Sequence, residues 1–296
     1  MSAMDSPVPG GPLRFGDMLS ATFQYLRRNP AATLGIGALL ATATSTVQGV
    51  MLNGFVFSSN RGAELEKVLS GSQLTEAELQ SAIDSIATLA PYLAVAFIVQ
   101  TIVQFLAMGV MTVGMVRAMQ GERVQPGALW SAVPWARILG INLLVFVAIL
   151  VGAGVPFGLA LFAPTPVAVV ALALAFGIGF ILAVASTLAV PASIVDGLGV
   201  MAAMRAAVLA TRTSVFRTTM LIVGSILFWS VVGSFIGSPI GSILGSLSGG
   251  SGSATGSALS SMVAGIIGGA ITLPASSAMA VLIYVDRIRR MRPSSF

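Results

Sequence analysis

The sequence predicts an all-α integral membrane protein with six transmembrane helices, and three observations lead to this prediction. Hydrophobic residues make up 56% of the 296 positions and charged residues only 8%, whereas soluble domains carry about 25% charged residues. Six apolar runs each reach or approach the roughly 20 residues that a helix needs to cross a bilayer. The basic residues gather in alternate connections between these runs. A soluble fold of this length could not bury so much apolar surface.

The chain before the first apolar run divides into two parts. Residues 1–12 are rich in Pro, Gly and Ser and are expected to form a disordered cytoplasmic tail. Residues 13–29 are expected to form a cytoplasmic amphipathic helix, which Asn29-Pro30 ends. No signal peptide is expected, because the first apolar run begins only after Pro30. The predicted apolar stripe of the helix consists of Phe15, Met18, Leu19, Thr22, Phe23 and Leu26.

A six-span membrane domain is expected over residues 30–290. A long acidic loop at 58–89, with a net charge of −3 and a capping-box pattern at Thr75 and Glu78, separates the first two runs. Residues 291–296 are expected to form a second cytoplasmic tail. Prolines within the spans are expected to kink them. The predicted spans are 31–57, 90–116, 138–162, 167–190, 218–245 and 259–285.

The distribution of basic residues predicts the orientation. If the N-terminus lies in the cytoplasm, only Arg61 and Lys67 fall outside, which leaves 13 of the 15 Lys and Arg inside. The opposite orientation inverts that ratio. Because cytoplasmic loops of membrane proteins carry an excess of Lys and Arg, we expect both termini inside and the loop at 58–89 outside.

A short amphipathic segment with an Arg and an aromatic residue precedes a long span at three places, which favours three units of interfacial helix plus helical hairpin. The segments begin near Phe15, Val124 and Gly199. The third is predicted as a helix from about Val200 that lies in the membrane interface. Its apolar stripe consists of Met201, Met204, Val208 and Leu209. Its polar residues, mostly on other faces, are Arg205, Thr211, Arg212 and Arg217.

Three segments resemble landmarks of a known family: PLRFGDMLSATFQYLRRNP from Pro12, PASIVDGLGVMAAMRAAVLATRTSVFRTTM from Pro191, and LIYVDRIRRMR from Leu282. They look like those of actinobacterial six-span membrane proteins that resemble the membrane domain of glycerophosphoryl diester phosphodiesterases. The resemblance covers about residues 12–292 and implies a plasma-membrane protein with no established activity. In the full-length phosphodiesterases a separate soluble domain hydrolyses substrate with histidines and metal-binding carboxylates. This chain has no histidine, so the resemblance implies no hydrolase activity.

Small residues recur every four positions in the fifth span, which predicts close helix packing. Gly265 and Gly269 offer a matching face on the last span. The alternative is a broken or re-entrant helix at Pro239 that lines a polar path with serine hydroxyls. The glycines of the stripe are Gly233, Gly237, Gly241 and Gly245.

Polar residues within or beside the spans are candidate sites. Gln100, Gln104 and Asn142 lie inside spans, where amides usually bond to a neighbouring helix; the alternative is contact with a substrate. Asp196 and Asp286 directly follow the fourth and sixth spans. They are expected to form local ion pairs or caps, with Arg289 or Arg290 as partners of Asp286, and the alternative is a role in coupling transport to an ion.

Six arginines form a predicted basic rim on the cytoplasmic side. Near the membrane surface, the attraction between each arginine and anionic lipid headgroups contributes up to about 1 kcal/mol of binding free energy. The alternative is that the rim docks a cytoplasmic partner, such as an ATPase subunit. The members of the rim are Arg27, Arg28, Arg137, Arg205, Arg212 and Arg217.

The amino-acid composition excludes several classes of function. The chain has neither cysteine nor histidine, which excludes thiol chemistry and removes the commonest general base and metal ligand. We expect no catalytic, cofactor-binding or metal-binding residues, no enzyme activity and no nucleic-acid partner. The first prediction is a scaffold or lipid-organising protein of a bacterial plasma membrane, with anionic lipid, its own copies or another protein as partner. The alternative is a transporter or permease subunit that works with a separate ATPase chain.

Overall fold

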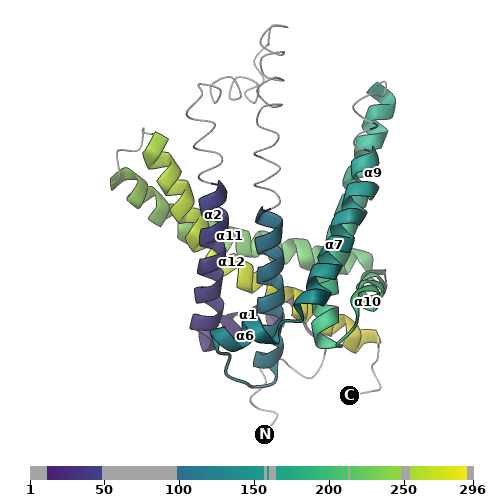
Figure 1. The fold of residues 1–296 in the computed structure, drawn as a ribbon, viewed down its shortest axis with the longest axis horizontal. Helices are drawn as coiled ribbons and strands as arrows, with labels where there is room; N and C mark the ends of the chain where they lie inside the picture. Colours follow the sequence, from purple (N-terminus) through teal and green to yellow (C-terminus); the bar gives the residue numbers. More distant parts are fainter. Residues whose placement is uncertain are drawn as a thin grey trace. The chain divides into compact units, whose positions relative to one another are not determined.

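The protein is a multi-pass α-helical membrane protein. The structure, a computed structural model, describes residues 12–48, 99–156, 159, 165–212, 214–247 and 254–291. Over these residues it contains helices and short turns and no strand (Figure 1). Five helices in this part of the chain are long and apolar enough to cross a membrane. They are Val99–Met119, Trp135–Pro156, Val169–Val195, Val215–Leu247 and Leu259–Met291.

The first predicted span begins with a π-helix, η1 (Ala31–Gly35), and continues as α2 (Ile36–Gln48). The preceding helix α1 (Phe15–Arg28) meets the helical stretch Ala31–Val47 at 89°. All six predicted spans thus overlap a described helix, as the apolar runs predicted. The acidic loop at 58–89, with Thr75 and Glu78, lies outside the described residues.

Three short helices each precede a helix that lies in a predicted span. They are α1, α6 (Pro126–Ala132) and α10 (Val200–Arg212), and they lead into α2, α7 (Trp135–Gly152) and α11 (Val215–Leu247). In each case a long helix then follows. After α2 it is Val99–Met119, after α7 it is α9 (Thr165–Val195), and after α11 it is α12 (Ala254–Met291). The element order therefore follows the three units that the sequence pattern favours.

The chain forms two compact units. The first comprises residues 1–34, 107–229 and 274–296, and the second comprises 35–106 and 230–273.

In the first unit, α10 packs against α9 and α7 through alanines. Ala203, Ala207 and Ala210 are fully buried, whereas most of the predicted apolar stripe is exposed. Small side chains let the helices approach closely, and Gly140 of α7 contributes to this, because a Cβ there would lie 2.8 Å from Val200 Cγ2. The side of α10 that faces the protein is therefore not the side with the large apolar residues.

Helix α1 buries a face rotated from the predicted stripe. Met18, Thr22 and Leu26 are buried as expected, but Phe23 is 49% exposed, and its ring packs 4.9 Å from that of the buried Trp229. Tyr25, which lay outside the predicted stripe, is fully buried. A glycine makes room for it, because a Cβ at Gly114 would collide with the Tyr25 hydroxyl.

In the second unit the glycine stripe of α11 packs directly on α12. A Cβ at Gly233 would lie 2.6 Å from Thr272 Cγ2, and one at Gly237 would lie 2.5 Å from the Ala264 carbonyl oxygen. A Cβ at Gly241 would collide with the Ser260 carbonyl oxygen. The matching face of α12 therefore has the same four-residue spacing as the stripe.

The predicted matching face was wrong by one helical position. Gly265 and Gly269 do not face α11; a Cβ on them would lie 2.7 Å from Ser45 Oγ and from Ala41 Cβ of α2, respectively. Because successive residues of a helix are rotated by about 100°, α12 presents one small-residue face to α11 and a second to α2. The sequence pattern could not distinguish these two faces.

The alternative of a broken helix at Pro239 is also wrong. Helix α11 continues from Val215 to Leu247 through Pro239, and α9 and α12 continue through Pro191 and Pro274. Ser242 and Ser246 donate their hydroxyls to carbonyls of their own helix, Ser238 at 2.8 Å and Ile243 at 2.8 Å.

Candidate functional site

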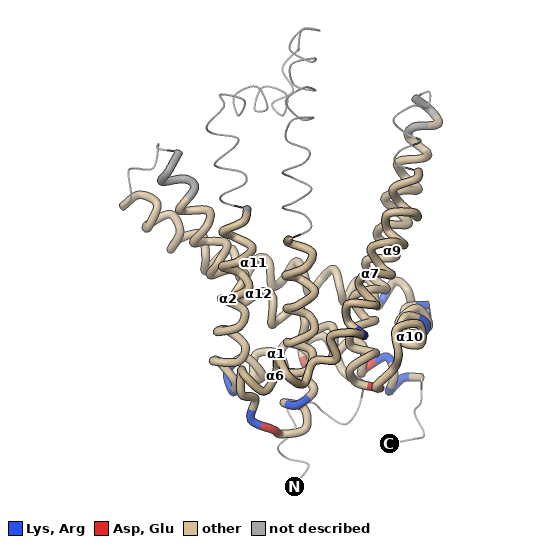
Figure 2. The backbone as a smooth tube through the Cα atoms, in the orientation of Figure 1, with Lys and Arg blue, Asp and Glu red and all other residues tan. Residues whose placement is uncertain are grey.

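All the charged side chains that the structure describes belong to the first unit, where Figure 2 shows them at short helices, turns and helix ends. The described part of the second unit carries no charge. The candidate site is therefore sought among the polar contacts of the first unit.

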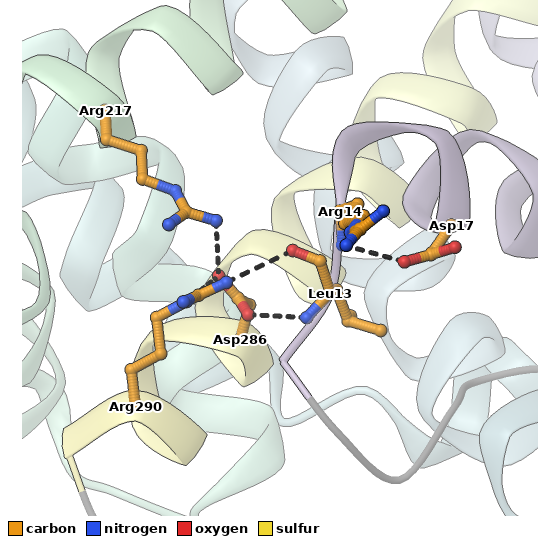
Figure 3. A network of polar contacts seen from close by, with 6 residues as sticks. All are labelled: Leu13, Arg14, Asp17, Arg217, Asp286 and Arg290. Carbon is orange, nitrogen blue, oxygen red and sulfur yellow. Dashed lines mark hydrogen bonds and ion pairs between the residues drawn. The ribbon is translucent and has the colours of Figure 1, made fainter.

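Asp286 is the centre of a polar network that joins three segments of the first unit (Figure 3). Its carboxylate is fully buried near the end of α12. One oxygen accepts the backbone N–H of Leu13 at 2.8 Å, and the other accepts Arg290 Nε at 2.8 Å and lies 3.9 Å from Arg217 Nη2. Arg290 Nη2 also donates to the Leu13 carbonyl at 3.3 Å. This network joins the last turns of α12 to the chain before α1 and to the start of α11.

The turn between α9 and α10 is held from three helices. Asp196 accepts a hydrogen bond from the Tyr284 hydroxyl of α12, and Arg137 of α7 donates to the Gly197 carbonyl at 2.9 Å. Ser193 of α9 donates to the Leu198 carbonyl at 2.9 Å. Gly197 has φ +65°, which an L side chain rarely adopts. Asp196 therefore lies in a structural turn.

Asn29 holds the corner between α1 and η1. Its Nδ2 donates to the Tyr25 carbonyl at 3.4 Å, and its Oδ1 accepts the Val124 N–H at 3.1 Å. Its carbonyl accepts the Thr33 hydroxyl at 2.8 Å. The sequence predicted a helix end at this position but not the contact with Val124, which is distant in sequence.

Together these contacts have a cyclic order. Leu13, two residues before α1, is held by Asp286 of the third predicted helix-plus-hairpin repeat. Val124, two residues before α6, is held by Asn29 of the first repeat, and Gly197, three residues before α10, is held by Arg137 of the second. The segment before each short helix is therefore anchored by a polar side chain from another of the three predicted repeats.

Arg287 differs from its neighbours, and the sequence analysis did not single it out. The residue is only 4% exposed, and its Nε and Nη2 atoms make no hydrogen bond. It interacts electrostatically with Arg217 and Arg290, which repel it, and with Asp286, which attracts it. Helical spacing places Arg287 on one face with Ala280 and Tyr284, but only the structure shows that this face is buried.

The predicted basic rim is not a single cluster. All six of its arginines are exposed. Arg217 joins the Asp286 network and Arg137 holds the Gly197 carbonyl, while Arg27 and Arg28 line a shallow hollow with Gln24. Arg205 and Arg212 lie on α10.

The predicted intramembrane amides differ from the expectation in part. Asn142 is buried, and among the described residues its Nδ2 has no hydrogen-bond partner, on a neighbouring helix or elsewhere. Gln104 is exposed on the helix Val99–Met119, and Gln100 is half-buried on the same helix.

Outside the spans, one phenol in this unit has a shifted pKa. Burial raises the pKa of the Tyr25 hydroxyl above its usual value, and its O–H lies 3.5 Å from the Met111 carbonyl. The group therefore stays neutral and acts as a packing residue with a weak polar contact.

Comparison with protein-family models, with curated proteins and with solved structures finds no match to this chain. The function is therefore inferred from the chain's own residues. Their chemistry consists of guanidinium donors around one buried carboxylate, an arrangement that can bind an anion.

Proposed function

We propose that the chain is a non-enzymatic scaffold that organises anionic lipid at the cytoplasmic face of a bacterial plasma membrane. The observation that carries this proposal is the outer face of α10. Met201, Val208 and Leu209 are each about half exposed there, and Arg205 and Arg212 are exposed beside them.

The order of residues on this face suits a membrane interface. At about 100° per residue, Arg205 and Arg212 lie between Val208 on one side and Leu209 on the other. The two arginines thus lie within the apolar stripe, whereas the sequence analysis placed them mostly on other faces of the helix. Arginine can lay its apolar stem along such a surface and extend its charge to the headgroups. A helix of this kind lies in the interface plane and binds anionic lipid.

The other two short helices support the same arrangement. Helix α1 meets the start of the first span at 89° and carries exposed Arg27 and Arg28 in its last turn. Near α6, the rings of Trp130 and Trp135 stack with centroids 5.6 Å apart, and tryptophan is enriched at membrane interfaces. All three predicted helix-plus-hairpin repeats therefore have amphipathic or aromatic residues just before a span.

The test is a measurement of how deep α10 lies. Because the chain has no cysteine, Met201→Cys supplies a single site for a polarity-sensitive fluorophore in vesicles containing phosphatidylglycerol. We expect an emission typical of the interface, and a red shift when Arg205→Glu and Arg212→Glu are added. The matched control is Arg123→Glu, an exposed arginine outside the three short helices. An aqueous spectrum in the starting protein would contradict the proposal.

A second experiment tests the scaffold class itself. The protein is extracted from its own membrane in native nanodiscs, and its lipids and co-purified proteins are quantified against the bulk membrane. We expect enrichment of anionic lipid, alone or with further copies of the chain. A stoichiometric ATPase with bulk lipid composition would instead favour the permease-subunit alternative.

A further inference from the structure

We propose that Arg287, together with Arg217 and Arg290, binds a phosphate group at the end of α12. The phosphate belongs either to an anionic phospholipid or to free phosphate. The lipid source rests on the proposed function, whereas the site itself does not.

The first argument is the burial of unused donors. Arg287 is only 4% exposed, yet two of its guanidinium nitrogens have no acceptor. Arginine remains charged in proteins, and a buried charge without a partner is strongly unfavourable. An acceptor is therefore needed at this position.

The second argument is the local charge balance. Three guanidinium groups, those of Arg217, Arg287 and Arg290, interact with a single carboxylate, that of Asp286. The excess is two positive charges. Asp286 accepts hydrogen bonds from Leu13 and Arg290, and its single charge can balance only one of the three guanidinium groups.

The described chain offers no other anion. Its remaining acidic side chains are engaged elsewhere, Asp17 with the Arg14 N–H, Glu122 with Arg117 and Asp196 with Tyr284. The C-terminal end of α12 contributes the equivalent of only about half a negative charge. This does not balance two positive charges among the described residues, and we infer that a bound anion supplies the difference.

The geometry of the unused donors favours a phosphate. Nε and Nη2 lie on the same edge of the guanidinium plane, and their N–H bonds are parallel. This edge matches two oxygens of one phosphate or carboxylate group in a bidentate pair. Arg217 and Arg290 are partly exposed, so they can reach the remaining oxygens. The site lies in the last turns of a membrane-spanning helix, where a phospholipid presents its phosphate.

The experiment measures thermal unfolding of the purified protein in a maltoside detergent, which contains no phosphate. Three additions are compared: dioctanoyl phosphatidylglycerol, dioctanoylglycerol, and inorganic phosphate against chloride at equal ionic strength. We expect phosphatidylglycerol to raise the midpoint by about 3 °C or more at saturation, and dioctanoylglycerol to leave it unchanged. An equal rise with inorganic phosphate identifies free phosphate as a sufficient ligand. No rise with either phosphate compound would overturn the proposal.

The variants are Arg287→Gln and a neighbouring control, Arg289→Gln. Arg287→Gln is expected to lose the rise and to unfold no earlier than the parent without ligand, because an unbalanced buried charge has been removed. The control is expected to keep the rise. A rise that persists in Arg287→Gln would overturn the site. That result would not change the measured depth of α10 or the lipid enrichment. Failure of the phosphate site can therefore be distinguished from failure of the proposed scaffold function.

A second variant covers the case in which Arg287→Gln does not fold. Arg287→Lys keeps the charge but loses the bidentate edge. Its affinity for phosphatidylglycerol, measured by native mass spectrometry, is expected to fall about tenfold, the effect of losing one hydrogen bond to a charged group. Unchanged affinity in this variant would contradict the proposed geometry.

Discussion

Asp286 is a buried acid whose removal has a predictable cost. Asp286→Asn leaves Arg217, Arg287 and Arg290 without a counter-charge, and we expect the free energy of unfolding to fall by about 2–3 kcal/mol. We expect no larger loss, because Arg217 and Arg290 are partly exposed and water screens their charges. The measurement is thermal or denaturant unfolding in detergent.

Asp17→Asn is the matched control. Asp17 also accepts one backbone N–H, that of Arg14, but at an exposed position. Its replacement is expected to cost less than about 1 kcal/mol, chiefly through the dipole of α1. Equal losses in the two variants would show that burial and the surrounding arginines do not govern the stability of the carboxylate.

Among the helices, the cyclic anchoring leads to a local prediction. Each anchor is expected to protect the amides at the start of one short helix, because it holds a residue two or three positions before that start. Asp286→Asn should raise hydrogen exchange at the start of α1, Asn29→Leu at the start of α6, and Arg137→Met at the start of α10. The measurement is hydrogen–deuterium exchange with mass spectrometry.

Each of these three variants serves as the control for the other two. If all of them raised exchange in the same region, the contacts would act through global stability rather than as separate anchors. The cyclic order would then have no mechanical meaning.

Packing of α11 on α12 leads to a further prediction. Gly237→Ala places a methyl group 2.5 Å from the Ala264 carbonyl oxygen. The helices must separate, and we expect a loss of about 1–3 kcal/mol. Gly224→Ala on the same helix meets nothing within 4 Å. It should be neutral or slightly stabilising, because alanine has the higher helix propensity. A similar loss in both variants would point to a backbone requirement and contradict the close-packing interpretation.

For the molecule as a whole, the positive-inside rule predicts an orientation that single-cysteine labelling checks. Ser70→Cys in the acidic loop should react with an impermeant maleimide in intact cells. Ser131→Cys, exposed on α6, should react only after the membrane is permeabilised. The reverse pattern would place the termini outside and remove the basis for cytoplasmic lipid binding.

The sequence predicted several residues of the site, but not the contacts between residues that are distant in sequence. Asp286 and Arg290 lie four residues apart on one helix, and their ion pair was among the expected alternatives. Leu13 lies 273 residues from Asp286, and no local pattern connects them. The same holds for Asn29 and Val124. Arg287 was one of several terminal arginines until the burial of its helix face was known.

The membrane class, the helices and their order follow from the sequence, because the bilayer imposes a length and an apolar composition on every segment that crosses it. The faces of those helices do not follow in the same way. In lipid, apolar side chains suit both the bilayer and a neighbouring helix, so hydrophobicity cannot show which side packs. Close packing decided it here: alanines face inward on α10, and α12 turns one small-residue face to α11 and another to α2.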